Sequence, residues 1–148
     1  MATFTQPEYQ VNLHRDALFL DTNVLVAKFI PDDSHHDQVL EFLEAYSDDY
    51  QWMVSIAVVV ETWGFIVGGR REWRYGQQFL TWLNYPGNLI EVFPQTADTI
   101  GVVRENSLEA RIDCIDTMLA CMVNEVNTQC GGYHPVAVAT YDTADFIR

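Results

Sequence analysis

Basic side chains are scarce in this sequence. Its 148 residues contain 8 lysines and arginines against 21 aspartates and glutamates, which gives a formal net charge of −13 at pH 7. Proteins that grip nucleic acid through its phosphates normally carry a surplus of lysine and arginine. The deficit excludes an ordinary basic nucleic-acid surface, so any function on nucleic acid needs metal ions and a local basic patch.

Cysteines and long apolar runs are also few. The three cysteines cannot form a complete disulfide framework, and none has the paired spacing of a zinc site. No apolar stretch reaches the about 18 uncharged residues that a membrane span requires. The first ten residues lack the basic start and apolar core of a signal peptide. We therefore expect a protein that has no contact with a membrane and is located in the cytoplasm.

What the sequence does contain is an alternation of strand and helix patterns. Short apolar segments at 16–21, 51–54, 89–93 and 135–139 fit buried strands. Between these segments, apolar residues recur at helical intervals. They predict helices at 24–30, in the segment after Asp33, and at 55–67, 70–83, 94–109 and 113–127. This order predicts an α/β fold, a three-layer α/β/α sandwich around a mostly parallel sheet of four or five strands. We expect one domain over residues 16–148, after an N-terminal extension at 1–15.

Four carboxylates lie within or beside these apolar elements. Glu61 interrupts the apolar run 53–67, where an ionised group without a partner would lose several kcal/mol of solvation. Asp21 and Asp142 follow the first and last strands, and Asp116 lies in the first turn of a predicted helix. Because ligands of parallel sheets bind beyond the carboxyl ends of the strands, we expect these acids to converge there.

Clustered carboxylates suit a divalent cation. Hard oxygen ligands favour Mg²⁺ or Mn²⁺, and a cation relieves their mutual repulsion. Such ions can activate a water and orient a phosphodiester. No Ser–His or Cys–His catalytic pair can be placed, and the four histidines, including His35 and His36, are expected at the surface in loops or at element ends.

All of these acids except Glu61 also have a structural interpretation. A helix cap would explain Asp21 or Asp145, and the dipole of a helix N-terminus would explain Asp116. Asp142 fits a turn. Glu61 lacks such an explanation, since its neighbours on both sides are apolar.

Four motifs in order carry a family resemblance. They are Phe19-Leu-Asp-Thr-Asn-Val-Leu25, Ser55 with Glu61, Asp116-Thr-Met-Leu-Ala120 and Ala139-Thr-Tyr-Asp-Thr-Ala-Asp-Phe146. Together they resemble the PIN-domain ribonucleases, including the toxins of VapC-type toxin–antitoxin pairs. The resemblance implies a PIN-like domain and a Mg²⁺- or Mn²⁺-dependent endoribonuclease. It also implies that the catalytic, metal-binding acids are Asp21, Glu61, Asp116 and Asp142, with Asp145 as a further metal ligand.

Three more residues would support this site. By the resemblance, Thr140 matches a hydroxyl residue that helps to place the metal-bound water or the scissile phosphate. The amide of Asn23 could orient Asp21, or Asn23 could simply form the turn at the strand exit. Asp113, one turn before Asp116, could join the site or serve as a structural or capping residue.

One basic patch stands out, at Arg70, Arg71 and Arg74. We expect it at the start of a helix, with Arg70 and Arg74 on one face and Trp73 and Tyr75 available for base stacking. The patch could bind RNA. Salt bridges with the plentiful acids are the alternative role.

Several functions stay open at this point. The leading hypothesis is RNA hydrolysis by a metal-activated water. The alternative is a catalytically weak or inactive PIN-fold binding module that acts through a protein partner. A toxin held by a basic antitoxin-like partner is intermediate between them. A small-molecule phosphatase would require an Asp-x-Asp signature, which is missing because position 23 is Asn.

The aromatic residues predict a homodimer. Trp63, Trp73 and Trp82 fall on the two predicted helices that flank Gly68-Gly69. This hairpin is too aromatic for a fully solvated surface, so we expect it to pair with a second copy. Burial of these rings within one domain is the alternative.

Overall fold

Four strands form one parallel sheet. A computed structural model describes residues 15–84, 89–92, 114–129 and 135–141. Its strands are β1 (Ala17–Leu20), β2 (Gln51–Ser55), β3 (Leu89–Val92) and β4 (Val136–Ala139). They lie in the order β3-β2-β1-β4, and every neighbouring pair is parallel. The predicted parallel sheet is therefore confirmed, with four strands in the described part of the chain.

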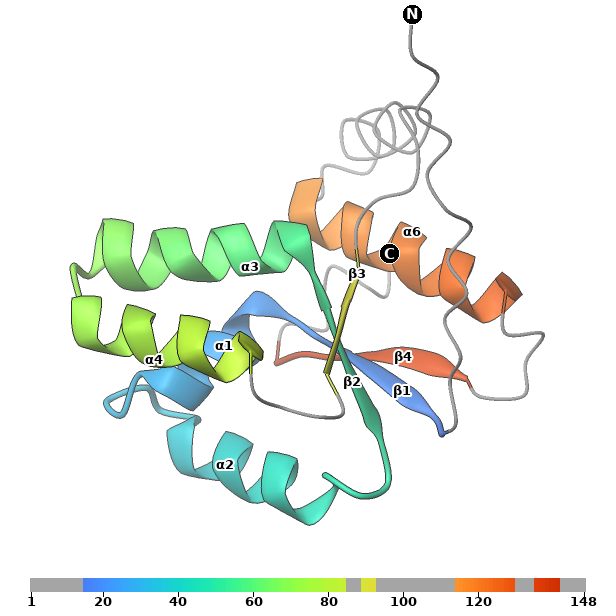
Figure 1. The fold of residues 1–148 in the computed structure, drawn as a ribbon, viewed down its shortest axis with the longest axis horizontal. Helices are drawn as coiled ribbons and strands as arrows, with labels where there is room; N and C mark the ends of the chain where they lie inside the picture. The colour runs from blue at the N-terminus through green and yellow to red at the C-terminus, as the bar shows by residue number, and fades with distance from the viewer. Residues whose placement is uncertain (1–14, 85–88, 93–113, 130–134, 142–148) are drawn as a thin grey trace, which may run out of the picture.

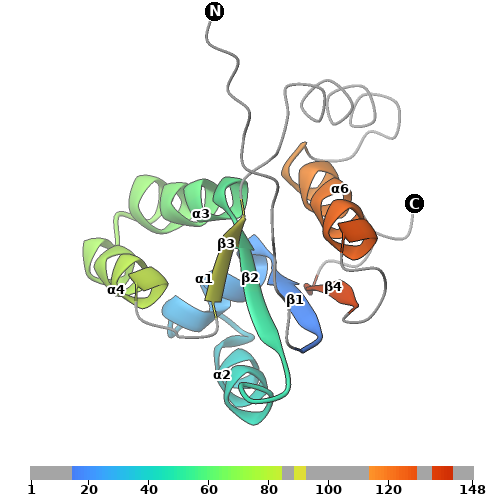
Figure 2. The ribbon, with the colours of Figure 1, turned by 45° about the vertical axis from the view of Figure 1, so that its right-hand side comes forward.

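Helices cover the sheet on both sides. The α-helices are α1 (Thr22–Phe29), α2 (His36–Ala45), α3 (Ile56–Trp63), α4 (Trp73–Asn84) and α6 (Cys114–Gln129), and a π-helical segment, η1 (Gly64–Gly69), continues α3. Figures 1 and 2 show α6 on one side of the sheet and α1, α2 and α4 on the other. The arrangement confirms the three-layer α/β/α sandwich. No helix among the described residues is long and apolar enough to cross a membrane.

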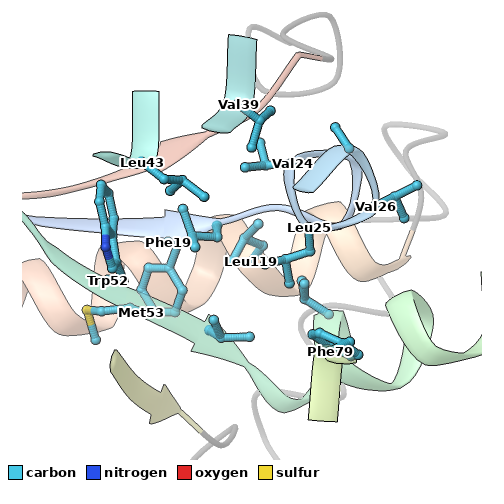
Figure 3. Close-up of a cluster of buried hydrophobic side chains, with 14 of the residues drawn as sticks. Phe19, Val24, Leu25, Val26, Val39, Leu43, Trp52, Met53, Phe79 and Leu119 are labelled. Atoms are coloured by element: carbon cyan, nitrogen blue, oxygen red, sulfur yellow. The ribbon is translucent and has the colours of Figure 1, made fainter. Parts of the chain in front are cut away.

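The core explains why the strand sequences are continuously apolar. Phe19 and Leu20 of β1 and Met53 and Val54 of β2 are fully buried. A strand that is covered on both faces has no solvent side, so it needs no alternating polar residue. Figure 3 shows side chains of α1, α2, α4 and α6 gathered around these strands, with Leu119 contributed by α6.

The starts of helices α1 and α4 differ from the predictions. Helix α1 begins at Thr22 instead of 24, because Asp21 caps it. Helix α4 begins at Trp73 instead of 70, because Arg71 has a φ of 58° in the left-handed region, which interrupts the helical path. The prediction that Arg70 and Arg74 share one helix face is therefore wrong.

Other predicted segments lie outside the described residues. These are the helix at 94–109 and residues 1–14 of the N-terminal extension. The division of the chain into an extension and one domain stays a prediction.

Candidate active site

Three of the predicted acids line a single cavity. Asp21 follows β1, Glu61 lies in α3, and Asp116 lies in the first turn of α6. The cavity has a volume of about 360 Å³, and its described lining residues are Asp21, Thr22, Asn23, Val26, Asp33, His35, Glu61, Phe65, Asp116 and Tyr141. The fold thus brings together carboxylates from three separate elements. The predicted site residues Asp113, Asp142 and Asp145 lie outside the described residues.

Asp21 is the most enclosed of these acids, with 4% of its surface exposed. Its Oδ1 accepts a hydrogen bond of 2.7 Å from the backbone N–H of Thr22, which makes it the N-cap of α1. Its Oδ2 accepts a second one, also 2.7 Å, from the hydroxyl of Thr140. The capping role and the place in the cavity are thus compatible, because both follow from the position of Asp21 between β1 and α1.

Asn23 and Thr140 link the two strand exits. The side-chain amide of Asn23 donates to Thr140 Oγ1 at 2.9 Å, and its carbonyl oxygen accepts from the backbone N–H of Tyr141 at 3.3 Å. Thr140 in turn donates to Asp21. Asn23 therefore ties the segment after β4 to the start of α1, and it reaches the carboxylate of Asp21 through Thr140.

Glu61 does not have the buried position expected from its apolar neighbours. Its side chain is exposed and accepts a hydrogen bond from the hydroxyl of Thr22. The expectation was wrong because successive helical residues point in different directions. On α3, Val58 and Thr62 are buried whereas Val60 is 65% exposed. Glu61 therefore faces the open cavity, where water solvates its charge.

The donor atoms fit a hard divalent cation in their chemistry. Asp21, Glu61 and Asp116 offer only oxygen ligands, which Mg²⁺ and Mn²⁺ prefer. Within the described ranges, no three histidine, cysteine, aspartate or glutamate side chains lie close enough together to hold an ion. Mg²⁺ usually retains several waters and takes one or two carboxylates, so a closed cage is not required.

Several lining residues of the cavity were not predicted as site residues, among them Asp33, His35 and Tyr141. Asp33 accepts a hydrogen bond of 2.9 Å from the backbone N–H of His35, but it does not cap α2, whose N-cap residue is His35 and has no side-chain cap hydrogen bond. The rings of His35 and Tyr141 are stacked, with centroids 4.1 Å apart and planes at 25°. Burial, and then the charge of Asp33, raise the pKa of Tyr141. The contact between His35 and Tyr141 joins segments far apart in the chain, so local sequence patterns carry no signal for it.

Comparison with known sequences identifies the family. The PIN domain profile matches residues 18–148. The chain belongs to the PIN domain family.

A solved structure shares this PIN fold. The crystal structure of VapC20 from Mycobacterium tuberculosis, described as a sarcin–ricin loop cleaving toxin, superposes with a TM-score of 0.67 and 19% sequence identity. The match covers 88% of this chain and 94% of VapC20. It confirms the resemblance seen in the sequence motifs at the level of the fold. Among curated proteins, no sequence matches this chain.

The basic patch of this PIN domain lies apart from its acids. Arg70 forms an ion pair with Asp32, whose two carboxylate oxygens lie 2.9 and 2.7 Å from Nη2. Arg74 lines a different cavity of about 470 Å³, together with four residues of α4. Arg71 is exposed. None of the three arginines is among the described residues of the acidic cavity.

Proposed function

We propose that this PIN domain is a Mg²⁺- or Mn²⁺-dependent endoribonuclease. The observation that carries the proposal is the convergence of Asp21, Glu61 and Asp116 on one cavity from three elements. Asp142 completes the proposed catalytic and metal-binding set, with Asp145 as an additional ligand. Bound divalent ions would supply an activated water and offset the negative charge that develops during phosphodiester hydrolysis.

The chain's own residues orient the acids before any substrate arrives. Two hydrogen bonds fix the carboxylate of Asp21, so it keeps one direction without having to be ordered on binding. The hydroxyl of Thr22 holds Glu61 toward the same cavity. Because ligands must sit within a fraction of an ångström of their working geometry, this support from neighbouring side chains is part of the proposed site.

The choice of RNA as substrate rests on the family. VapC20, which has the same fold at 19% identity, is described as a toxin that cleaves the sarcin–ricin loop. We therefore propose RNA as the substrate of this chain and the toxin of a toxin–antitoxin pair as its biological role. A cytoplasmic location agrees with that role and stays a prediction.

The test compares RNA cleavage by wild type and Asp21→Asn, each with Mg²⁺, with Mn²⁺ and with EDTA. Cleavage should require a divalent ion, and Asp21→Asn should lower the rate by about 100-fold or more, the usual effect of losing one preorganised charged group. Glu44→Gln is the matched control, because Glu44 is an exposed acid on α2 outside the cavity. Equal cleavage rates for wild type and Asp21→Asn would rule the proposal out. So would a wild type that cleaves RNA neither with Mg²⁺ nor with Mn²⁺.

A binding role through a basic partner is the second candidate. The described residues of the cavity include four acids and neither lysine nor arginine. Such a site attracts an arginine or lysine from another protein. A neighbouring gene for a small protein with a DNA-binding head and a basic tail would support an antitoxin. The purified pair should form a complex that Glu61→Gln weakens, whereas unchanged affinity would place the partner elsewhere.

A further inference from the structure

The stacked rings of His35 and Tyr141 form one wall of the acidic cavity. His35 immediately precedes α2 and Tyr141 follows β4, so the stack joins two distant parts of the chain. The side chain of His35 is 45% exposed, which leaves part of the imidazole open to the cavity and to solvent. The half-exposed imidazole, backed by the ring of Tyr141, therefore lies next to the carboxylates of the cavity.

Polar contacts fix the backbone at both residues, and one more reaches the imidazole. The backbone N–H of Tyr141 donates to Asn23 Oδ1 at 3.3 Å, and that of His35 donates to Asp33 Oδ1 at 2.9 Å. The hydroxyl oxygen of Ser34 lies 3.2 Å from Nδ1 of the imidazole. Because the stack exists before a ligand binds, little side-chain entropy is lost when it receives one.

The charge of the cavity makes such a surface necessary for RNA. Four of the described lining residues are acids, and none of those residues is lysine or arginine, so this described part of the lining repels phosphate. Bound cations would relieve that repulsion, but affinity for the rest of a nucleotide must come from uncharged contacts. Stacking of a base on an aromatic ring is such a contact, and histidine and tyrosine both provide it.

We propose that the His35–Tyr141 pair is a stacking platform for one nucleobase of the RNA strand that enters the acidic cavity. The inference rests on the proposed nuclease function and adds to it a residue pair that positions the substrate. The proposal assigns base stacking to this pair instead of to Trp73. Trp73 is 66% exposed and packs edge-to-face on Trp63 outside this cavity. Purines should bind more tightly than pyrimidines, because their larger rings overlap more of the platform.

The test measures binding separately from cleavage. The probe is 2-aminopurine riboside 5′-monophosphate in Mg²⁺, which contains no phosphodiester to cleave and loses fluorescence when its base stacks. His35→Ala should raise its Kd roughly 5- to 100-fold, whereas His35→Phe, which keeps a ring, should stay within about twofold of wild type. Tyr46→Leu is the control, since Tyr46 is an exposed aromatic residue outside the cavity.

The outcomes separate the platform from the nuclease. An unchanged Kd for His35→Ala would overturn the platform, and so would an equal loss for His35→Phe, because it would assign the effect to the imidazole nitrogens. Tyr141→Leu, checked for folding by thermal unfolding, should match His35→Ala. If the probe fluorescence is quenched in a way that depends on His35 but RNA is not cleaved, only the proposed nuclease is refuted. If RNA is cleaved but the probe fluorescence is not quenched, only the platform is refuted. In active enzyme, His35→Ala should raise KM more than it lowers kcat.

Discussion

At Asp21, one carboxylate has two roles that usually belong to different residues. It caps α1 through Oδ1 and accepts the hydroxyl of Thr140 through Oδ2, while it also lines the acidic cavity. Asparagine caps a helix about as well as aspartate, so the two roles can be separated by one substitution. Asp21→Asn removes the charge and keeps the cap.

Thermal unfolding with and without Mg²⁺ makes that separation measurable. A ligand present at 100 times its Kd stabilises the folded state by about 2.7 kcal/mol. Wild type should show a gain of this size, and Asp21→Asn a much smaller one, because one of the proposed ligands has lost its charge. In EDTA, Asp21→Asn removes one negative charge from the cavity but also replaces the oxygen that accepts the hydroxyl of Thr140, so the two effects oppose each other and its stability should stay within about 2 kcal/mol of wild type. Equal Mg²⁺-induced shifts in the two proteins would contradict Asp21 as a ligand.

Thr140 supports the same carboxylate. Its hydroxyl donates to Asp21 and accepts from Asn23, so Thr140→Val removes both hydrogen bonds at nearly constant side-chain shape. We expect the free energy of unfolding in EDTA to fall by about 1–3 kcal/mol, the usual cost of depriving a buried polar group of a partner. Thr140→Ser keeps the hydroxyl and is the matched control. Urea denaturation measures the free energy of unfolding of both variants. Equal values for Thr140→Val and wild type would show that the hydroxyl contributes nothing to stability.

At the scale of elements, apolar runs predict strands better than they predict which side of a helix is buried. Strands β1, β2 and β4 fell where short apolar segments predicted them, but only β1 and β2 have the expected burial, because β4 lies at the edge of the described sheet and its Ala137 is exposed. The run that contains Glu61 was misjudged, because the sequence there is apolar all around the helix and gives no sign of which face meets the core. Only the packing of α3 against the rest of the domain leaves Val60 exposed and Val58 buried.

Some residues of the cavity could be predicted from the sequence, and others could not. Asp21 and Asp116 could be predicted, because strand ends and first turns of helices are marked locally by capping residues and apolar runs. Asp33, His35 and Tyr141 could not, because they join the cavity through tertiary contacts between the loop before α2 and the segment after β4. The lining of a cavity depends on how the elements pack together, which local periodicity does not determine.

The contact between η1 and α4 provides a test at the scale of elements. A Cβ built at Gly76 would lie 2.4 Å from Val67 Cγ2 and 3.1 Å from Trp63 Cζ3. We expect Gly76→Ala to destabilise the protein by about 1–3 kcal/mol through overpacking. At Gly64, which has helical φ and ψ, a Cβ would meet nothing within 4 Å. Gly64→Ala should therefore gain about 0.5–1 kcal/mol from the smaller entropy loss on folding. Chemical denaturation measures the change in the free energy of unfolding for each variant. Changes of the same sign in Gly76→Ala and Gly64→Ala would contradict this account.

At the scale of the whole molecule, exposed apolar side chains support the proposed homodimer. Val60, Phe65 and Trp73 are 65%, 48% and 66% exposed on α3, η1 and α4. Trp63 packs edge-to-face against Trp73 at 6.2 Å, whereas Trp82 packs against Phe29 within the domain. The interface that we propose therefore excludes Trp82.

Sedimentation tests this interface. Wild type should be a dimer at micromolar concentration, and Trp73→Glu should be a monomer because a charge would replace the exposed ring. Leu40→Glu is the control, since Leu40 is an exposed apolar residue on α2. A monomeric wild type would exclude the homodimer at that concentration.

The net charge of −13 makes the dependence of RNA binding on salt informative. Each phosphate contact from a lysine or arginine contributes about one unit to the slope of log K against log salt, because binding releases a counterion. Arg70 already pairs with Asp32, whereas no ion pair to Arg74 is seen among the described residues. We therefore expect Arg74→Ala to flatten the slope by roughly one unit and Arg70→Ala to leave it nearly unchanged. Mg²⁺ affinity should stay the same in both variants, since neither arginine lines the acidic cavity. An equal slope for wild type and Arg74→Ala would show that Arg74 makes no phosphate contact and would assign it to the structure of α4.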